Sequence, residues 1–204
     1  MATLAIDPQL EQRLLDERHA RGADHHDEVW EGTRLMTPMP NNEHQEIVSR
    51  LIFVLESVVG VPGLGRVTPG VNLAGSAENW EQDYRCPDAA VFLTDTAAED
   101  CGSFWRGAAD FVVEIISPGD RSREKLGFYE KIGVRELLLV DRDPWRLELY
   151  RLQEGRLVMV GNSGPAEGET LTSRVLPLSF RLVPGTPRPK IEVTHRDSRR
   201  QWAA

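Results

Sequence analysis

The chain has 204 residues, of which 40% are hydrophobic, and a formal net charge of −8. This length fits one domain with a sizeable core, and the composition excludes an intrinsically disordered chain. The apolar segments are too short to cross a bilayer and the first residues lack the pattern of a secretory signal, so we expect a cytoplasmic protein without a membrane partner.

The acidic net charge opposes non-specific binding to a polyanion, but a local basic surface can outweigh it. Such charge is concentrated from Arg181 onward, where six basic residues accompany two acidic ones. The two cysteines, Cys86 and Cys101, have neither zinc-site nor redox-motif spacing. We therefore interpret both as packing residues.

In chain order, the first segments predict two helices separated by a hairpin. Asp7 and Pro8 have the N-cap and N1 pattern of a first helix. Residues 28–36 predict two short strands around a tight turn. Asn42 is the expected cap of the second helix. The apolar face of that helix consists of Ile47, Leu51, Val54, Leu55 and Val58.

The middle of the chain predicts strands. Residues 65–73 are expected to form an edge strand, since Pro69 has no N–H for a sheet ladder. Residues 85–93 predict a second strand. Residues 111–116 predict a third, which is apolar on both faces and therefore central in its sheet.

The following segments predict a third helix and three more strands. Ser122 is the expected cap of a helix that reaches Ile132. Residues 136–141 predict a buried strand, and residues 145–152 and 156–160 predict a hairpin. The order of elements predicts an α/β or α+β fold, in which helices flank a mixed β-sheet.

The domain organisation follows from the same pattern. Residues 1–183 are expected to form a single domain with an N-terminal hairpin and additional C-terminal strands. Residues 184–204 contain three prolines and several arginines. We expect this Pro/Arg-rich tail to be loosely held.

One acidic residue stands inside a hydrophobic strand. Glu114 shares a face with Val112 and Ile116, where a bare carboxylate would be destabilising unless it is paired or metal-bound. Asp88 stands at the start of another strand. Two carboxylates near strand ends can hold a hard divalent cation. The structural alternatives are an ion pair for Glu114 and a turn for Asp88.

The segments around Asp88, Glu114 and Lys125 resemble the core signature of the Uma2 family, restriction-endonuclease-like proteins of the PD-(D/E)XK nuclease superfamily. Flanking segments fit the same family, and the resemblance spans about residues 24–183. The flanking segments are Glu28–Gly32, Asn42–Leu51, Gly133–Asp141 and Leu171–Pro177.

This resemblance implies a restriction-endonuclease-like core and a Mg²⁺-dependent endodeoxyribonuclease. Asp88 and Glu114 would bind Mg²⁺ or Mn²⁺, and the backbone carbonyl of Ile115 could add a ligand. Lys125 would orient the attacking water or neutralise charge on the phosphate. The expected substrate is DNA and the expected assembly is a homodimer.

The chain departs from the superfamily pattern at one catalytic position. The pattern places a lysine two residues after the glutamate, and here Ile116 stands there. Lys125 on the following helix would replace it, with a solvated helix lysine as the structural alternative. Lys131 could compete, but it lies on a different helical face.

Three further residues are candidates for the pocket. His44 and Glu46 lie on the second helix, and Tyr129 shares a helical face with Lys125. Each has an equally simple structural interpretation, as an exposed or core residue; the same holds for Glu43.

Two other functions remain open. One is a catalytically inactive protein of the same fold that binds nucleic acid, a nucleotide or a protein partner, which the acidic charge and the missing strand lysine favour. The other is a hydrolase of a different phosphoester. DNA cleavage would separate the first alternative from the nuclease, and a substrate panel would separate the second.

Overall fold

A computed structural model describes residues 8–117, 119, 121–166 and 168–204. The helices are α1 (Pro8–Ala20), α2 (Asn42–Leu55) and α3 (Leu126–Ile132), with a π-helical turn η1 (Glu56–Gly60) and 3-10 turns η2 (Trp80–Gln82) and η3 (Ser122–Lys125). Among the described residues, no helix has the length and apolar character needed to cross a membrane.

A six-stranded sheet forms the centre of the structure, in the order β12-β11-β10-β9-β6-β3. Its strands are β3 (Gly65–Pro69), β6 (Ala89–Leu93), β9 (Phe111–Ile115), β10 (Glu136–Arg142), β11 (Trp145–Gln153) and β12 (Arg156–Ser163). Strands β9 and β10 are parallel, while the other neighbours are antiparallel. A parallel pair needs a crossover connection, and η3 and α3 provide it.

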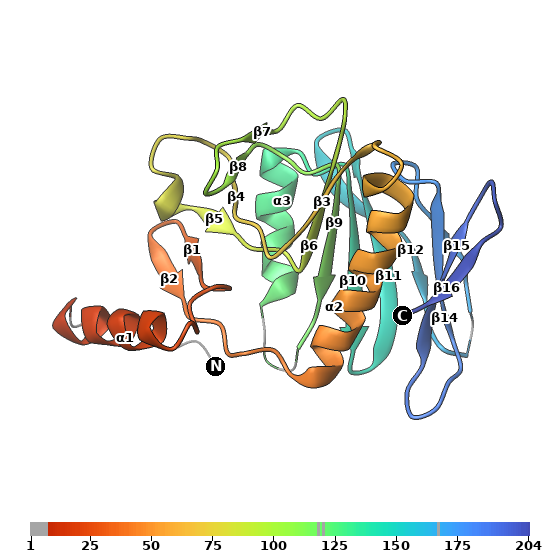
Figure 1. The fold of residues 1–204 in the computed structure, drawn as a ribbon, viewed down its shortest axis with the longest axis horizontal. Helices are drawn as coiled ribbons and strands as arrows, with labels where there is room; N and C mark the ends of the chain where they lie inside the picture. The colour runs from red at the N-terminus through yellow and green to blue at the C-terminus, as the bar shows by residue number, and fades with distance from the viewer. Residues whose placement is uncertain (1–7, 118, 120, 167) are drawn as a thin grey trace.

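The two faces of the central sheet are covered by different helices (Figure 1). Val113 and Ile115 of β9 pack in one core cluster with the apolar face of α2. Val112 points to the opposite face and packs with Phe128 and Tyr129 of α3. This alternation follows from the two-residue period of a strand, and it turns Glu114 toward α3.

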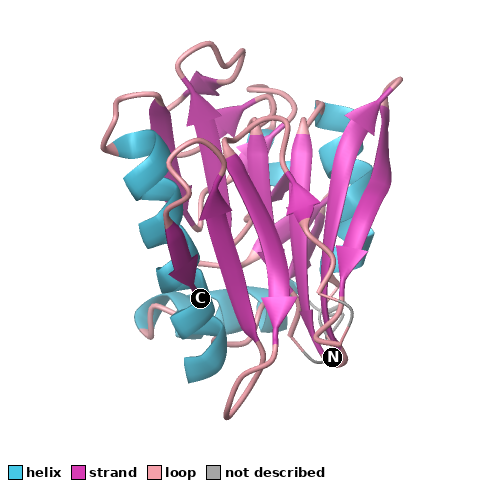
Figure 2. Ribbon diagram, turned by 90° about the vertical axis from the view of Figure 1, so that its right-hand side faces the viewer, coloured by secondary structure: helices cyan, strands magenta, loops and turns pink. Residues whose placement is uncertain are grey.

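Two smaller sheets complete the fold. The N-terminal sheet has the order β2-β1-β5-β4-β8-β7. Its strands are β1 (Glu28–Trp30), β2 (Thr33–Leu35), β4 (Leu73–Ala74), β5 (Tyr84–Arg85), β7 (Glu99–Asp100) and β8 (Trp105–Arg106). The C-terminal sheet consists of β13 (Leu171–Thr172), β14 (Leu178–Val183), β15 (Lys190–His195) and β16 (Gln201–Ala203). Figure 2 views the molecule from the side of this C-terminal sheet.

The expectation of a loosely held tail is wrong. Strand β15 pairs with β14 over its full length, and β16 pairs with β15. Ile191, Val193 and Ala204 are buried in the same core cluster as α2. The prolines of this segment lie before β15, so they shape the connection and leave the sheet ladder intact.

The predicted hairpins are confirmed, as are the edge strand that contains Pro69 and the central strand that contains Glu114, whereas the single strand predicted for residues 85–93 is wrong. The turns at Glu31–Gly32 and Glu154–Gly155 have positive φ at both residues (48° and 83°, 50° and 77°), as a two-residue type I′ turn requires. Strand β3, which ends at Pro69, lies at the edge of its sheet, and β9 lies inside it. Residues 85–93 form two strands in different sheets, because the segment that contains Pro87 separates β5 from β6.

Two predicted helix caps differ from the structure. Asn41 caps α2 instead of Asn42, since its Oδ1 accepts the His44 N–H at 2.9 Å. Ser122 lies inside the 3-10 turn η3 and does not cap α3. The expected cap of the first helix, Asp7, lies outside the described residues. Gly133 ends α3 with φ 95°, as predicted for a helix terminus.

The burial of β15 gives a stability prediction. Ile191→Ala should lower the free energy of unfolding by about 2–5 kcal/mol, because it leaves a cavity in the core. Val158→Ala on the exposed part of β12 should change it by less than about 0.5 kcal/mol. Urea unfolding measures both; equal losses in the two variants would show that β15 does not contribute to the core.

Candidate functional site

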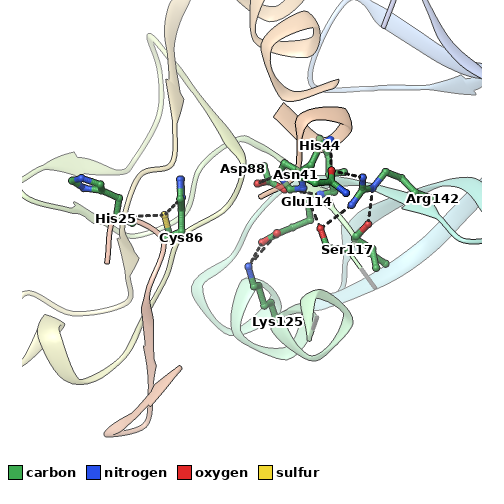
Figure 3. A network of polar contacts seen from close by, with 12 residues as sticks. His25, Asn41, His44, Cys86, Asp88, Glu114, Ser117, Lys125 and Arg142 are labelled. Carbon is green, nitrogen blue, oxygen red and sulfur yellow. Dashed lines mark hydrogen bonds and ion pairs between the residues drawn. The ribbon is translucent and has the colours of Figure 1, made fainter. Parts of the chain in front are cut away.

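The register of two strands brings the two predicted carboxylates together. Strands β6 and β9 are antiparallel with Ala89 opposite Val113, so the next pair outward is Asp88 and Glu114. Asp88 Oδ2 accepts the Ile115 N–H at 2.7 Å, which fixes its carboxylate at the end of β9 (Figure 3). Cross-strand neighbours of this kind have Cβ atoms about 5 Å apart.

Glu114 is held by two residues of the crossover. Its side chain is 3% exposed, and Lys125 Nζ lies 3.0 and 3.1 Å from its two carboxylate oxygens. The Tyr129 hydroxyl also donates to Glu114 Oε1. Burial raises the pKa of Glu114 above its ordinary value, Lys125 opposes this shift, and the nearby Asp88 and Glu28 add to it. The contact between Lys125 and Glu114 is therefore compatible both with the ion pair that was the structural alternative for Glu114 and with the expected place of Lys125 in the site.

A third carboxylate, Glu28, was not among the predicted site residues. Its Oε1 lies 2.7 Å from Lys125 Nζ and accepts the Cys86 N–H at 2.9 Å. Its Oε2 accepts the Trp30 indole N–H at 2.6 Å. Glu28 lies in the first hairpin, so its place beside Lys125 depends on how the N-terminal sheet packs on α3. Its position in a segment that resembles the Uma2 pattern was the available signal.

Lys125 therefore lies between two buried carboxylates. Its side chain is 12% exposed, and burial by itself would lower its pKa. Glu114 and Glu28 more than offset this, so the pKa of Lys125 is raised and the side chain stays charged. Lys131, the alternative lysine, is 71% exposed and lies 3.9 Å from Asp83.

His44 joins the site from the first turn of α2. Its Nε2 lies 2.8 Å from Asp88 Oδ1, and an ionised carboxylate only accepts, so Nε2 donates this bond. Its Nδ1 lies 3.3 Å from Ser117 Oγ. Glu46, by contrast, points to the surface, where Arg50 pairs with it at 3.0 Å. The structure thus places His44 beside Asp88 and places Glu46 elsewhere.

Arg142, at the end of β10, extends this network (Figure 3). Its guanidinium donates to the Ile116 carbonyl at 3.1 Å and to Ser117 Oγ at 2.8 Å. It also donates to Asn41 Oδ1 at 3.1 Å and to Glu43 Oε2 at 3.0 Å. No sequence pattern marks Arg142 or Ser117 as site residues, because only the parallel pairing of β9 and β10 places both strand ends at one edge.

The donor set at Asp88 and Glu114 fits a hard cation. An ionised carboxylate has about four acceptor positions. Among the described residues, two hydrogen bonds reach Asp88 and three reach Glu114, so both retain acceptor capacity. Groups of three or more His, Cys, Asp and Glu arranged as a metal cage do not occur in this part of the chain. Mg²⁺ is commonly held by one or two carboxylates and water.

The chain is similar to known proteins over most of its length. Residues 9–184 match the family model described as "Uma2: Putative restriction endonuclease". A solved structure from Anabaena variabilis ATCC 29413, described as "a putative nuclease belonging to DUF820", is similar with a TM-score of 0.54 and 24% identity. The match covers 65% of this chain and 75% of that chain. No curated protein gives a match. The solved structure supports the fold, and the expected mixed α+β architecture is confirmed.

The cysteines give a chemical test of the site. Cys86 is buried next to Glu28, and burial raises its pKa to about 12, whereas Cys101 is exposed, contrary to its predicted packing role. At pH 8 a disulfide reagent should modify Cys101 quickly and Cys86 only after unfolding, because the protonated thiol is a poor nucleophile. The folded Cys101→Ser variant, in which Cys86 is the remaining thiol, should not react with the reagent. Rapid labelling of that variant would contradict the buried position of Cys86.

Proposed function

Because the chain belongs to the Uma2 family, whose description supports a nuclease-like function, we propose that it is a metal-dependent endonuclease that hydrolyses phosphodiester bonds of DNA. The observation that carries this proposal is the position of Asp88 opposite Glu114, with the Lys125 ammonium on Glu114. This constellation has the composition that the resemblance implies, although its lysine comes from η3 instead of β9.

Asp88 and Glu114 would hold the cation, Mg²⁺ or Mn²⁺, and the Ile115 carbonyl remains a predicted third ligand. When bound, the cation would supply a Lewis acid for the phosphodiester. The Ile115 N–H and His44 hold the Asp88 carboxylate in place, so it needs little reorganisation to act as a ligand.

Lys125 would stabilise negative charge that develops on the phosphate. Its ammonium is fixed by Glu114 and Glu28, and a fixed charge in a largely buried position acts strongly on a nearby anion. Tyr129 donates to Glu114 and so keeps that carboxylate oriented. We assign Lys125 the catalytic role and Tyr129 a positioning role.

A catalytically inactive binding protein is the second candidate, and one observation favours it. Lys125 contacts both oxygens of Glu114, so the carboxylate and the ammonium already neutralise one another. A buried pair of this kind can persist as a purely structural element. The homodimer and the cytoplasmic location stay predictions.

DNA cleavage is the first test of the proposed function. Purified protein should nick supercoiled and genomic DNA with Mg²⁺ or Mn²⁺ and not with EDTA. Asp88→Asn and Lys125→Met should each lower the rate by about 100-fold or more. Asp88→Asn weakens the cation site, and Lys125→Met removes the fixed positive charge near the reacting phosphate. Gel electrophoresis of the products measures the rate.

Lys131→Ala is the matched control, because it removes an exposed lysine from the same crossover and should leave the rate unchanged. Circular dichroism checks that each variant is folded. If Lys125→Met does not fold, Asp88→Asn still tests the site, because asparagine has nearly the same shape as aspartate. Folded wild-type protein that cuts none of these DNAs would refute the nuclease and favour the binding protein.

A second prediction tests the cation separately from catalysis. Mn²⁺ at 100 times its Kd should stabilise the wild-type protein by about 2.7 kcal/mol, because it binds the folded state only. Differential scanning calorimetry should show a rise in Tm that EDTA reverses. Glu114→Gln should abolish the rise and Asp95→Asn, at an exposed carboxylate, should keep it. An equal rise in Glu114→Gln would place the cation elsewhere.

A further inference from the structure

A pocket of about 430 Å³ opens at the carboxyl ends of β9 and β10, where Ile116, two residues after Glu114, lines it. Its lining includes Ser117, Arg121, Arg123, Glu124, Asp141 and Arg142. Ser117 and Arg142 also belong to the network that reaches Asp88 through His44 (Figure 3). A ligand in this pocket would therefore lie next to the proposed reaction centre, and the carboxyl ends of parallel strands are a common place for ligands.

We propose that this pocket binds a backbone phosphate of a nucleic-acid strand, and that Arg121 makes the direct contact. This inference rests on the proposed function, because it identifies where the strand continues beyond the cleaved bond. Guanidinium groups bind phosphate through paired N–H donors, and three arginines line this pocket.

Arg121 is the arginine that can exchange its partner. It pairs with Glu124 through Nε and Nη2, which uses two of the five N–H donors of the guanidinium. Arg121 is 42% exposed and Glu124 is 54% exposed. An exposed pair of this kind contributes about 0–1 kcal/mol, so a phosphate can displace Glu124 at little cost.

The Trp30 ring holds the Arg121 guanidinium in position. The Arg121 guanidinium carbon lies 4.6 Å from the centroid of the Trp30 ring, within the range of a cation–π contact. The Trp30 indole is itself fixed by its bond to Glu28. Arg121 is thus held against a rigid surface, and less conformational entropy is lost when it binds a ligand.

The other two arginines are fixed by their own partners. Arg123 donates to Glu148 and to Asp141, and Arg142 donates to four groups around the end of β10. Their charges are compensated by these carboxylates, so the direct phosphate contact is assigned to Arg121.

The pocket is not uniformly basic, since Glu124, Asp141 and Asp143 also line it. Asp141 shares Arg123 with Glu148, and Glu124 competes with an incoming phosphate for Arg121. Removal of the Glu124 charge should therefore strengthen binding. A purely structural Arg121–Glu124 pair would not show this response.

The test is binding of a fluorescein-labelled single-stranded oligonucleotide in EDTA, followed by fluorescence anisotropy at several salt concentrations. Arg121→Ala should weaken binding about 10-fold and reduce the salt slope by about 0.7, the value for one lost phosphate contact on a single strand. Glu124→Gln should tighten binding about threefold, because it removes a carboxylate that repels the phosphate and competes with it for Arg121. Arg106→Ala is the matched control, since Arg106 also forms an exposed pair, with Glu99.

Three results would overturn the phosphate site: no binding by the wild-type protein, an unchanged salt slope in Arg121→Ala, or an equal loss in Arg106→Ala. The experiment contains EDTA, so it reports binding in the absence of cleavage. Loss of binding in Arg121→Ala together with absent cleavage by the wild type would refute the nuclease and keep the phosphate site. DNA cleavage by the wild-type protein together with unaltered binding by Arg121→Ala would support the nuclease and refute the phosphate site.

Discussion

The burial of Glu114 is the constraint on which the rest of the site depends. A carboxylate on the covered face of a central strand is destabilising unless charge and hydrogen bonds compensate it. Lys125 and Tyr129 supply both, so η3 and α3 must cross this face of the sheet. Glu28 shares the Lys125 ammonium, which ties the first hairpin to the same point. One buried charge thereby joins three parts of the chain.

Strand β9 takes part in two kinds of pairing, and each supplies a different part of the site. Its antiparallel pairing with β6 places Asp88 opposite Glu114. Its parallel pairing with β10 brings Arg142 beside Ser117 and the pocket above them. The carboxylate pair and the arginine-lined pocket are therefore neighbours because they share one strand.

The net charge of the chain fits such an arrangement. An acidic surface does not attract a polyanion over long distances, so binding must come from local, preorganised groups. Arg121 on Trp30 and the buried Lys125 are groups of this kind. Both are paired with carboxylates, and in the proposed phosphate site only the exposed Arg121–Glu124 pair would have to exchange its partner.

The sequence by itself determined the elements and part of the site. Alternation along residues 111–116 indicated a central strand with a carboxylate on it. The order of motifs identified the family and predicted Asp88 and Lys125 as site residues. Only the tertiary structure decided which groups meet. The positions of Glu28, Ser117 and Arg142 depend on strand register and sheet order, and the burial of Ile191 and Val193 depends on pairing with β14. These contacts join residues far apart in the chain, whereas local periodicity reports only the residues within one element.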